Sequence, residues 1–346
     1  MFRHLVHQEY DFMDLESVSE ALSDREDVFN IKVVKETVFR DKEYQFLVEC
    51  DLIITTFKIP IVIAIPQNWT RSLIDIYIKR NTEFPFIPHI DIKGKFCLFE
   101  LEGILIDQNL YGIVLQSLDR AKKIIEDGLA GVNTEEFVNE FNSYWIQLPH
   151  IRYAKCELPE HNQMTLMKYS QKVIGKRKKE TYIDFIQRSQ SQKIYLSKDA
   201  CDLIKYYQKN EKYIIKNALY IPIELNEFLL PPDPRYKISE EYIQTLLNYV
   251  DVKIYLSLMK KLGSTKLLIF SIKQPNEVVT LLGILIEKCE ISTDNGMCIL
   301  KSVNQVVPVY IERVDKQYLM TRSSGMENLL SDKKVLLIGC GSIGSY

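Results

Sequence analysis

Two hydrophobic periods follow one another near the start of the chain. Apolar residues at helical spacing, Leu15, Val18 and Leu22, predict an amphipathic helix at roughly 11–24, with its acidic residues facing solvent. After it, apolar and polar residues alternate, and this period of two predicts strands with one buried face. The alternating runs lie at 44–52, 59–65 and 74–78, and their short connections predict an antiparallel meander. Pro60 predicts that the second of these runs is an edge strand or begins there.

The pattern changes again in the next part of the chain. Two prolines in an irregular segment from 81 to 103 favour extended backbone and exclude a helix. Beyond it, apolar residues at helical spacing predict a helix over 107–127, with Asp107 as its cap and Gly128 and Gly131 at its end. A shorter helix is predicted over 134–145, beginning at Thr134, which can cap it. Residues 1–150 therefore read as an α+β domain.

Residues 151–320 show a second mixed pattern without internal repeats. A basic run centred on 176–179 predicts a solvated linker or helix face, with a surface for an anionic partner as the alternative. Helical patterning recurs at 239–262. Strand-like runs recur at 266–272, 278–286 and 306–311, so we expect a linker domain of mixed α/β structure.

Composition narrows the class of protein. Hydrophobic residues make up 46% of the 346 residues and charged residues 26%, which excludes a disordered or collagen-like chain. The formal net charge is −2, so the overall charge of the chain does not favour a nucleic-acid partner. No apolar run is long enough for a membrane span, and the first residues lack the apolar stretch of a signal peptide. We therefore expect a cytoplasmic protein.

Seven cysteines are present, an odd number without a dense framework. No two have the CxxC spacing of a zinc site, because the nearest two, Cys289 and Cys298, are nine residues apart. The sequence therefore predicts neither a disulfide framework nor a metal centre.

A glycine motif stands at the end of the chain. Residues 333–338 read as a short buried strand, and Gly339, Gly341 and Gly344 follow it as GxGxxG. Such glycines let backbone amides approach phosphate closely at the start of a helix. The chain stops at Tyr346, so we expect that residues 1–346 are the N-terminal part of a longer protein. We also expect that these residues alone do not catalyse adenylation. Taken alone, the motif also fits a dinucleotide-dependent oxidoreductase, or a glycine-rich tail without a site.

One cysteine lies where a rigid scaffold could present it. Cys97 follows the proline-containing irregular segment, and a thiolate there could accept an acyl group and pass it on. His89, eight residues earlier, could position a reacting group or simply fill a turn. The alternative is that Cys97 is a small buried hydrophobic residue of a non-catalytic binding module.

The residues around Cys97 carry a family likeness. The segment Phe84-Pro85-Phe86-Ile87-Pro88 resembles the YPF-x-x-P motif of the ubiquitin-conjugating fold, and Gly94-Lys95-Phe96-Cys97-Leu98 resembles its G-x-I-C-L motif. The resemblance implies a helix, a four-strand meander and further helices over residues 1–150, with Cys97 as the catalytic thioester residue. The histidine of the family's His-Pro-Asn triplet is matched by His89, whereas the asparagine that supports the oxyanion has no counterpart.

A second likeness lies at the other end. Residues 321–346 resemble the opening of a ThiF/MoeB-type adenylation domain, in which this Rossmann-like strand and its glycines bind ATP rather than NAD. The resemblance implies that Gly339, Gly341, Gly344 and Arg322 contact ATP. ATP and Mg²⁺ are then cofactors of the full-length protein, and no complete cofactor site is expected in residues 1–346.

The order of these domains is similar to that of bacterial fusion enzymes of antiphage defence. The resemblance implies that ATP adenylates the C-terminus of a partner protein with a ubiquitin-like or flexible tail, such as a cGAS-like nucleotidyltransferase. Cys97 then receives the acyl group and passes it to an amine. It also implies a homodimer formed through the adenylation domain, with no membrane or nucleic-acid partner.

Overall fold

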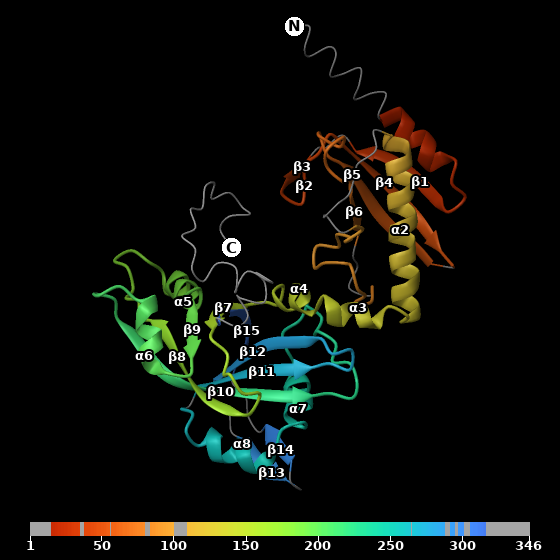
Figure 1. Cartoon of the computed structure of the whole chain (residues 1–346). Helices are drawn as coiled ribbons and strands as arrows, with labels where there is room; N and C mark the ends of the chain where they lie inside the picture. Colours follow the sequence, from red (N-terminus) through yellow and green to blue (C-terminus); the bar gives the residue numbers. More distant parts are fainter. Residues whose placement is uncertain are drawn as a thin grey trace, which may run out of the picture. The chain divides into compact units, whose positions relative to one another are not determined.

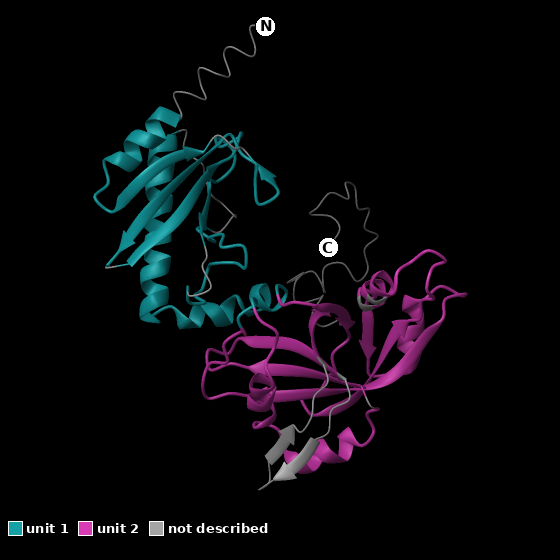
Figure 2. Cartoon of the chain, turned by 180° about the vertical axis from the view of Figure 1, so that it is seen from behind, with its two compact units in different colours: residues 1–147, 233–235 teal, residues 148–232, 236–346 magenta. Residues whose placement is uncertain are grey.

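The computed structural model describes residues 15–34, 38–55, 57–79, 84–99, 109–263, 265–287, 291–294, 297–300 and 305–315. The chain forms two compact units, which Figure 2 shows in teal and magenta. Unit 1 comprises residues 1–147 and 233–235, and unit 2 comprises residues 148–232 and 236–346. The four residues predicted to contact ATP, Arg322, Gly339, Gly341 and Gly344, lie outside the described residues.

Unit 1 combines one sheet with helices. A helix over residues 15–23 lies inside the predicted range of 11–24, the first residues of which are outside the described part. The other elements of unit 1 (Figure 1) are β1 (Val28–Val34), β2 (Val38–Phe39), β3 (Lys42–Glu43), β4 (Phe46–Ile54), β5 (Phe57–Ile65), β6 (Asp75–Ile78), α2 (Leu110–Ala130), α3 (Thr134–Asn139) and α4 (Phe141–Trp145).

The sheet of unit 1 has the order β1-β4-β5-β6, and each strand is antiparallel to its neighbour. Strands β4, β5 and β6 correspond to the three alternating runs. The edge position expected for Pro60 is wrong, because β5 lies between β4 and β6. Pro60 is tolerated there because β6 first pairs with β5 one residue later, at Ile61, and the Pro60 carbonyl accepts a hydrogen bond from Lys79 N at 2.9 Å.

The main core of unit 1 lies on one face of this sheet. Alternate residues of β4 and β5, such as Val48 and Ile63, pack there against Leu22 of the first helix and Leu118 of α2. A smaller cluster on the other face contains Tyr44, Leu47, Val62, Ala64 and Tyr77. Within the described part of unit 1, the helices that pack on the sheet lie on the first of these faces.

The boundaries of α2 differ from the prediction. Its N-cap is Asn109, whose side chain accepts a hydrogen bond from Gly112 N at 3.1 Å, whereas the predicted cap Asp107 lies outside the described residues. Gly128 does not end the helix, which continues to Ala130. The helix ends at the other glycine predicted there, Gly131, which has a left-handed φ of 70°.

Unit 2 is built on a closed barrel with the strand order β10-β11-β12-β15-β7-β9-β8. The strands predicted at 266–272, 278–286 and 306–311 correspond to β11, β12 and β15, whereas the closure of the sheet was not predicted. Its elements are β7 (Arg152–Cys156), β8 (Thr165–Lys172), α5 (Tyr182–Gln190), β9 (Ile194–Ser197), α6 (Ala200–Leu203), η1 (Ile204–Tyr206), β10 (Tyr213–Glu224), α7 (Glu240–Leu247), α8 (Val252–Met259), β11 (Thr265–Lys273), β12 (Val279–Glu287), β13 (Ile291–Asp294), β14 (Met297–Leu300) and β15 (Gln305–Arg313).

The interior of the barrel is filled by apolar side chains from its strands, among them Met167, Ile194, Leu267 and Val309, each fully buried. The predicted helical region 239–262 is two helices, because Ser239 caps α7 and Asp251 caps α8. The basic run 176–179 is exposed and lies between β8 and α5. Among the helices that the structure describes, none combines the length and the apolar character that crossing a bilayer requires.

Candidate active site

The segment that carries Cys97 is anchored to the helices that follow it. Phe86 packs its ring against Phe137 of α3 and Tyr144 of α4, with centroid separations of 4.7 Å and 5.2 Å. Ile87 is buried against α2, where a Cβ on Gly128 would lie only 2.7 Å from the Ile87 Cβ. A glycine inside α2 therefore allows this close approach.

A tight turn then leads the chain to Cys97. Gly94 N donates to Asp91 O at 2.9 Å, and the Asp91 carboxylate accepts from Lys95 N at 2.8 Å. Gly94 has a φ of +80°, and its carbonyl accepts from Ile78 N of β6 at 2.8 Å. The role of Asp91 in the described structure is therefore to close the turn that ties this segment to the sheet.

Cys97 is held at the surface of unit 1. Its backbone N–H donates to His89 O at 2.8 Å, and its neighbours Phe96 and Leu98 are buried. The thiol itself is exposed, whereas Cys50 is buried, and burial raises the pKa of the Cys50 thiol to about 12. The binding-module alternative expects a buried Cys97, so the exposed thiol argues against it.

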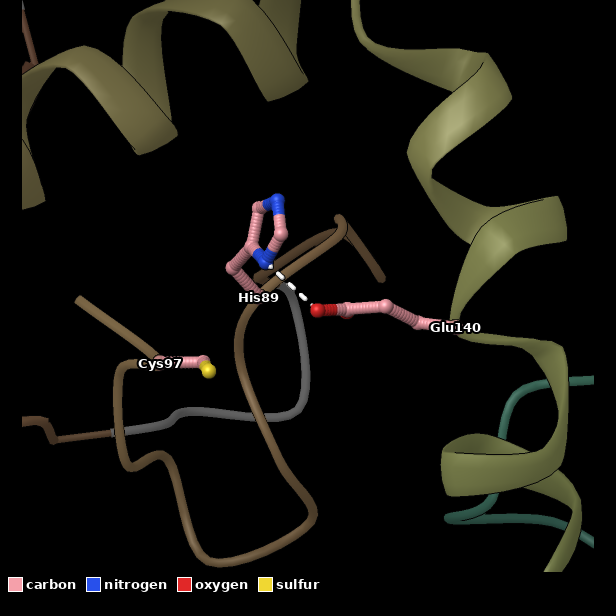
Figure 3. Close-up of side chains that lie close together, drawn as sticks. All are labelled: His89, Cys97 and Glu140. Atoms are coloured by element: carbon pink, nitrogen blue, oxygen red, sulfur yellow. Dashed lines mark ion pairs between the residues drawn. The ribbon is translucent and has the colours of Figure 1, made fainter. Parts of the chain in front are cut away.

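His89 lies between the carboxylates of Glu136 and Glu140, and Figure 3 shows the contact with Glu140. Its backbone is left-handed, with a φ of 61°, and its side chain is 16% exposed. Nε2 lies 2.9 Å from Glu136 Oε2 in a hydrogen bond, and Nδ1 lies 2.9 Å from Glu140 Oε1. The Nδ1 contact lacks hydrogen-bond geometry and is an ion pair only, so Nδ1 is a buried nitrogen without a hydrogen-bond partner.

These neighbours raise the pKa of His89 to about 10. The Cys97 side chain close to the ring is the largest cause, the Glu140 carboxylate adds to it, and burial opposes both. For Glu140, burial pushes the pKa upward, but the ion pair with His89 and the hydrogen bond from Tyr144 outweigh it, so its pKa is lowered. Both groups are therefore charged near neutral pH.

Tyr144 holds His89 in place through two hydrogen bonds of its hydroxyl group. Its hydroxyl donates to Glu140 Oε2 at 2.8 Å and accepts from His89 N at 2.7 Å. Tyr144 is almost fully buried, and burial raises the pKa of its hydroxyl, which stays protonated. One side chain of α4 thus holds both the backbone and the ion-pair partner of His89.

The exposed side chain of Cys97 lines a pocket of unit 1. Arg120 of α2 reaches the same pocket, where its Nε donates to Leu98 O at 3.3 Å. The residues that line the pocket are His89, Cys97, Leu98, Phe99, Arg120, Glu136, Asn139 and Glu140.

The fold brings the two sequence-predicted catalytic residues together. A ring nitrogen of His89, the Cys97 sulfur and a carboxylate oxygen of Glu140 all lie within 4.8 Å of one another. Sequence reasoning missed Glu136, Glu140, Tyr144 and Arg120. The available signal was the pair of glutamates four residues apart in the region predicted as a helix, which places both on one face.

This arrangement supports nucleophilic chemistry at sulfur. An exposed thiol beside a cationic imidazole can form a covalent intermediate, because positive charge stabilises a thiolate and an oxyanion alike. The carboxylates of Glu136 and Glu140 face two cations in the pocket, His89 and Arg120, so these charges balance.

Residues 14–152 match the family model described as prokaryotic E2 family B, E2 being the ubiquitin-conjugating class. The matched region contains the sheet, the Cys97 segment and helices α2, α3 and α4. The match supports a ubiquitin-conjugating-like domain and, at a coarse level, a role in ubiquitin-like conjugation. A comparison with curated proteins returns no match for the chain.

Proposed function

We propose that Cys97 accepts an acyl group as a thioester and passes it to a primary amine. The observation that carries the proposal is the exposed Cys97 thiol, held in a pocket beside the ring of His89 and within the region that matches prokaryotic E2 family B. A thioester is a good acyl donor, so two such steps replace one difficult condensation.

The two steps balance as thiol exchange and aminolysis. In the first, the Cys97 sulfur bonds to the acyl carbon of a donor thioester, and the donor thiol leaves with a proton. In the second, the amine nitrogen bonds to the same carbon, the bond to sulfur breaks, and the Cys97 thiolate takes up the proton that the amine loses. No oxidant or reductant is needed.

His89 acts as a positioning and electrostatic group in this proposal. The sequence lacks the asparagine that supports the oxyanion in the family it resembles, and the ring of His89 supplies positive charge near the reacting carbon. Glu136 and Glu140 hold the ring by its two nitrogens, which limits its freedom to turn away.

In our proposal the acyl group is first activated as an adenylate with ATP and Mg²⁺, as the ThiF-like sequence of residues 321–346 implies. A cysteine of the adenylating part then carries the group as the thioester that is the donor to Cys97. Arg322, Gly339, Gly341 and Gly344 are the residues we assign to ATP. The acylated protein would present a flexible or ubiquitin-like C-terminal tail, a cGAS-like nucleotidyltransferase being one example. On the basis of the same resemblance, we propose that two chains form a homodimer through the adenylation domain. We also propose that the protein acts in antiviral defence.

A peptide thioester tests the first step without the natural donor. We expect the complete chain to gain the peptide mass on Cys97, as a bond cleaved by hydroxylamine, and Cys97→Ser to lose this labile adduct. Cys201→Ser is the matched control, because Cys201 is the other exposed cysteine among the described residues. Equal labile acylation in wild type and Cys97→Ser, or none in either, would contradict the proposal.

A further inference from the structure

We propose that His89 Nδ1, Cys97 Sγ and a carboxylate oxygen of Glu140 bind a divalent cation of the zinc type, which holds the thiol in a closed, non-nucleophilic state. The three donor atoms lie within 4.8 Å of one another. Thiolate, imidazole and carboxylate are the ligand types that Zn²⁺ prefers. Among the described residues, no other group of three such donors lies so close together.

The atoms that would not touch the metal already have partners. Nε2 of His89 is hydrogen-bonded to Glu136 at 2.9 Å, and Oε2 of Glu140 accepts from the Tyr144 hydroxyl at 2.8 Å. A carboxylate on the second nitrogen is what a metal-bound histidine usually has, because it fixes the ring and raises its basicity. This leaves His89 Nδ1, buried and without a hydrogen-bond partner, to face Glu140 Oε1 and Cys97.

The present geometry needs only a small adjustment to coordinate a metal. Bonds of about 2.3 Å to sulfur and about 2.0–2.2 Å to nitrogen and oxygen place tetrahedral ligands roughly 3–4 Å apart. Nδ1 and Oε1 are 2.9 Å apart, and the exposed Cys97 side chain can rotate toward them. Three protein ligands leave a fourth position for water, on the side where the pocket opens.

Charge also favours a cation here. With Cys97 as a thiolate, the pocket carries three negative groups, Cys97, Glu136 and Glu140, against the imidazole of His89 and one guanidinium, that of Arg120. The metal replaces the thiol proton and the proton on Nδ1, so two protons are released on binding. The sequence argument against zinc rested on the absence of CxxC, and donors from two segments, 89–97 and the start of α4, leave no such signature.

The site shares its thiol with the proposed acyl transfer but does not depend on it. A metal-bound Cys97 is unavailable to an acyl donor, so the cation would act as a reversible block. Binding is measured without turnover. If metal binds but no thioester forms, only the proposed function fails, and if a thioester forms but no metal binds, only this inference fails.

The test uses the complete chain with Co²⁺ as a spectroscopic probe and Zn²⁺ in titration calorimetry. We expect a sulfur-to-cobalt charge-transfer band that Cys97→Ser removes and Cys201→Ser keeps. Glu140→Gln, which can keep the hydrogen bond from Tyr144, should weaken Zn²⁺ binding about tenfold or more, and Glu136→Gln should weaken it by about 10–100-fold through His89.

Alkylation gives a second readout within one molecule. Zn²⁺ should slow iodoacetamide labelling of Cys97, followed by peptide mass spectrometry, and leave the labelling of Cys201 unchanged. The proposal is overturned if Zn²⁺ does not protect Cys97, or if the cobalt band and the Zn²⁺ affinity are the same in wild type, Cys97→Ser and Glu140→Gln.

Discussion

At the scale of single residues, Tyr144 determines how His89 is presented to the thiol. Its hydroxyl is the one group bonded to both the backbone of His89 and the carboxylate of Glu140 in the described hydrogen bonds. The contact with His89 could not be predicted from the sequence, since 55 positions separate His89 from Tyr144 and no motif connects them. Cys97 and His89, in contrast, were identified because their motifs are local and contiguous.

Tyr144→Phe should therefore disturb the site more than the fold. Removal of the hydroxyl leaves His89 N and Glu140 Oε2 each without a partner, at a cost of about 1–3 kcal/mol in unfolding free energy. We expect slower thioester formation at Cys97, measured with the peptide thioester. Tyr111→Phe on α2, where the ring is 39% exposed, is the control and should leave both quantities unchanged. Unchanged acylation in Tyr144→Phe would show that the hydroxyl does not position His89.

At the scale of elements, the clean alternation of β4, β5 and β6 could be predicted, whereas β1 could not. The register of β1 against β4 shifts between Phe29 and Lys32, and Asn30 within this bulge has a φ of 55°. The bulge destroys the period of two on which the prediction relies. The barrel was not predicted from the sequence. Strands β8 and β10, whose pairing closes it, are partly polar and therefore lack a clear apolar period, and they are not adjacent in the chain.

Gly94, in the turn before Cys97, is harder to replace by another residue than Gly131 at the end of α2. A Cβ on Gly94 would lie 2.5 Å from Ile78 O, in addition to the strain of a φ of +80°. Gly131 has a φ of +70° but open space around its Cβ position. We expect Gly94→Ala to lower the unfolding free energy by about 3 kcal/mol and Gly131→Ala by about 1 kcal/mol. Urea denaturation measures both, and equal losses would mean that the turn can move away from β6.

A charged cluster joins the turn before β1 to α2. Asp27 accepts from Arg25 Nε at 2.8 Å and from Lys122 Nζ at 2.7 Å. The hydrogen bonds with Arg25, the largest cause, lower the pKa of Asp27 to about 2, with Lys122 contributing and burial opposing. The folded chain therefore binds fewer protons than the unfolded chain between about pH 2 and 4, so this stabilisation is present above about pH 4 and is lost as the pH falls through about 2.

Asp27→Asn tests this cluster. We expect it to cost about 2 kcal/mol of unfolding free energy at pH 6, from the size of the pKa shift, and progressively less as the pH falls below about 4. Urea titrations at several pH values measure the difference from wild type. Asp119→Asn is the control, because the Asp119 side chain is 66% exposed and contacts Arg25 alone among the described ion pairs. A cost that does not change with pH would contradict the assigned pKa.

At the scale of the whole molecule, the two units have separate cores, and the family match lies on one of them. The core of unit 1 surrounds α2 and supports the Cys97 segment, whereas that of unit 2 fills the barrel. For residues 1–150, sequence motifs supported a hypothesis about the fold. For unit 2, the hydrophobic periodicity was the only signal that we used. Periodicity identifies strands without saying which strands pair, so a closed barrel and an open mixed sheet look alike in sequence.

Transfer from sulfur to nitrogen is the measurement that tests the account most directly. Cys97 is first loaded with a peptide thioester in the complete Cys201→Ser chain, the free donor is removed, and free lysine is added. We predict that the thioester disappears at a rate that rises with lysine concentration, as the peptide–lysine amide appears in equal amount. A loaded Cys97 that is lost only by hydrolysis, at a rate independent of lysine, would contradict a role in conjugation.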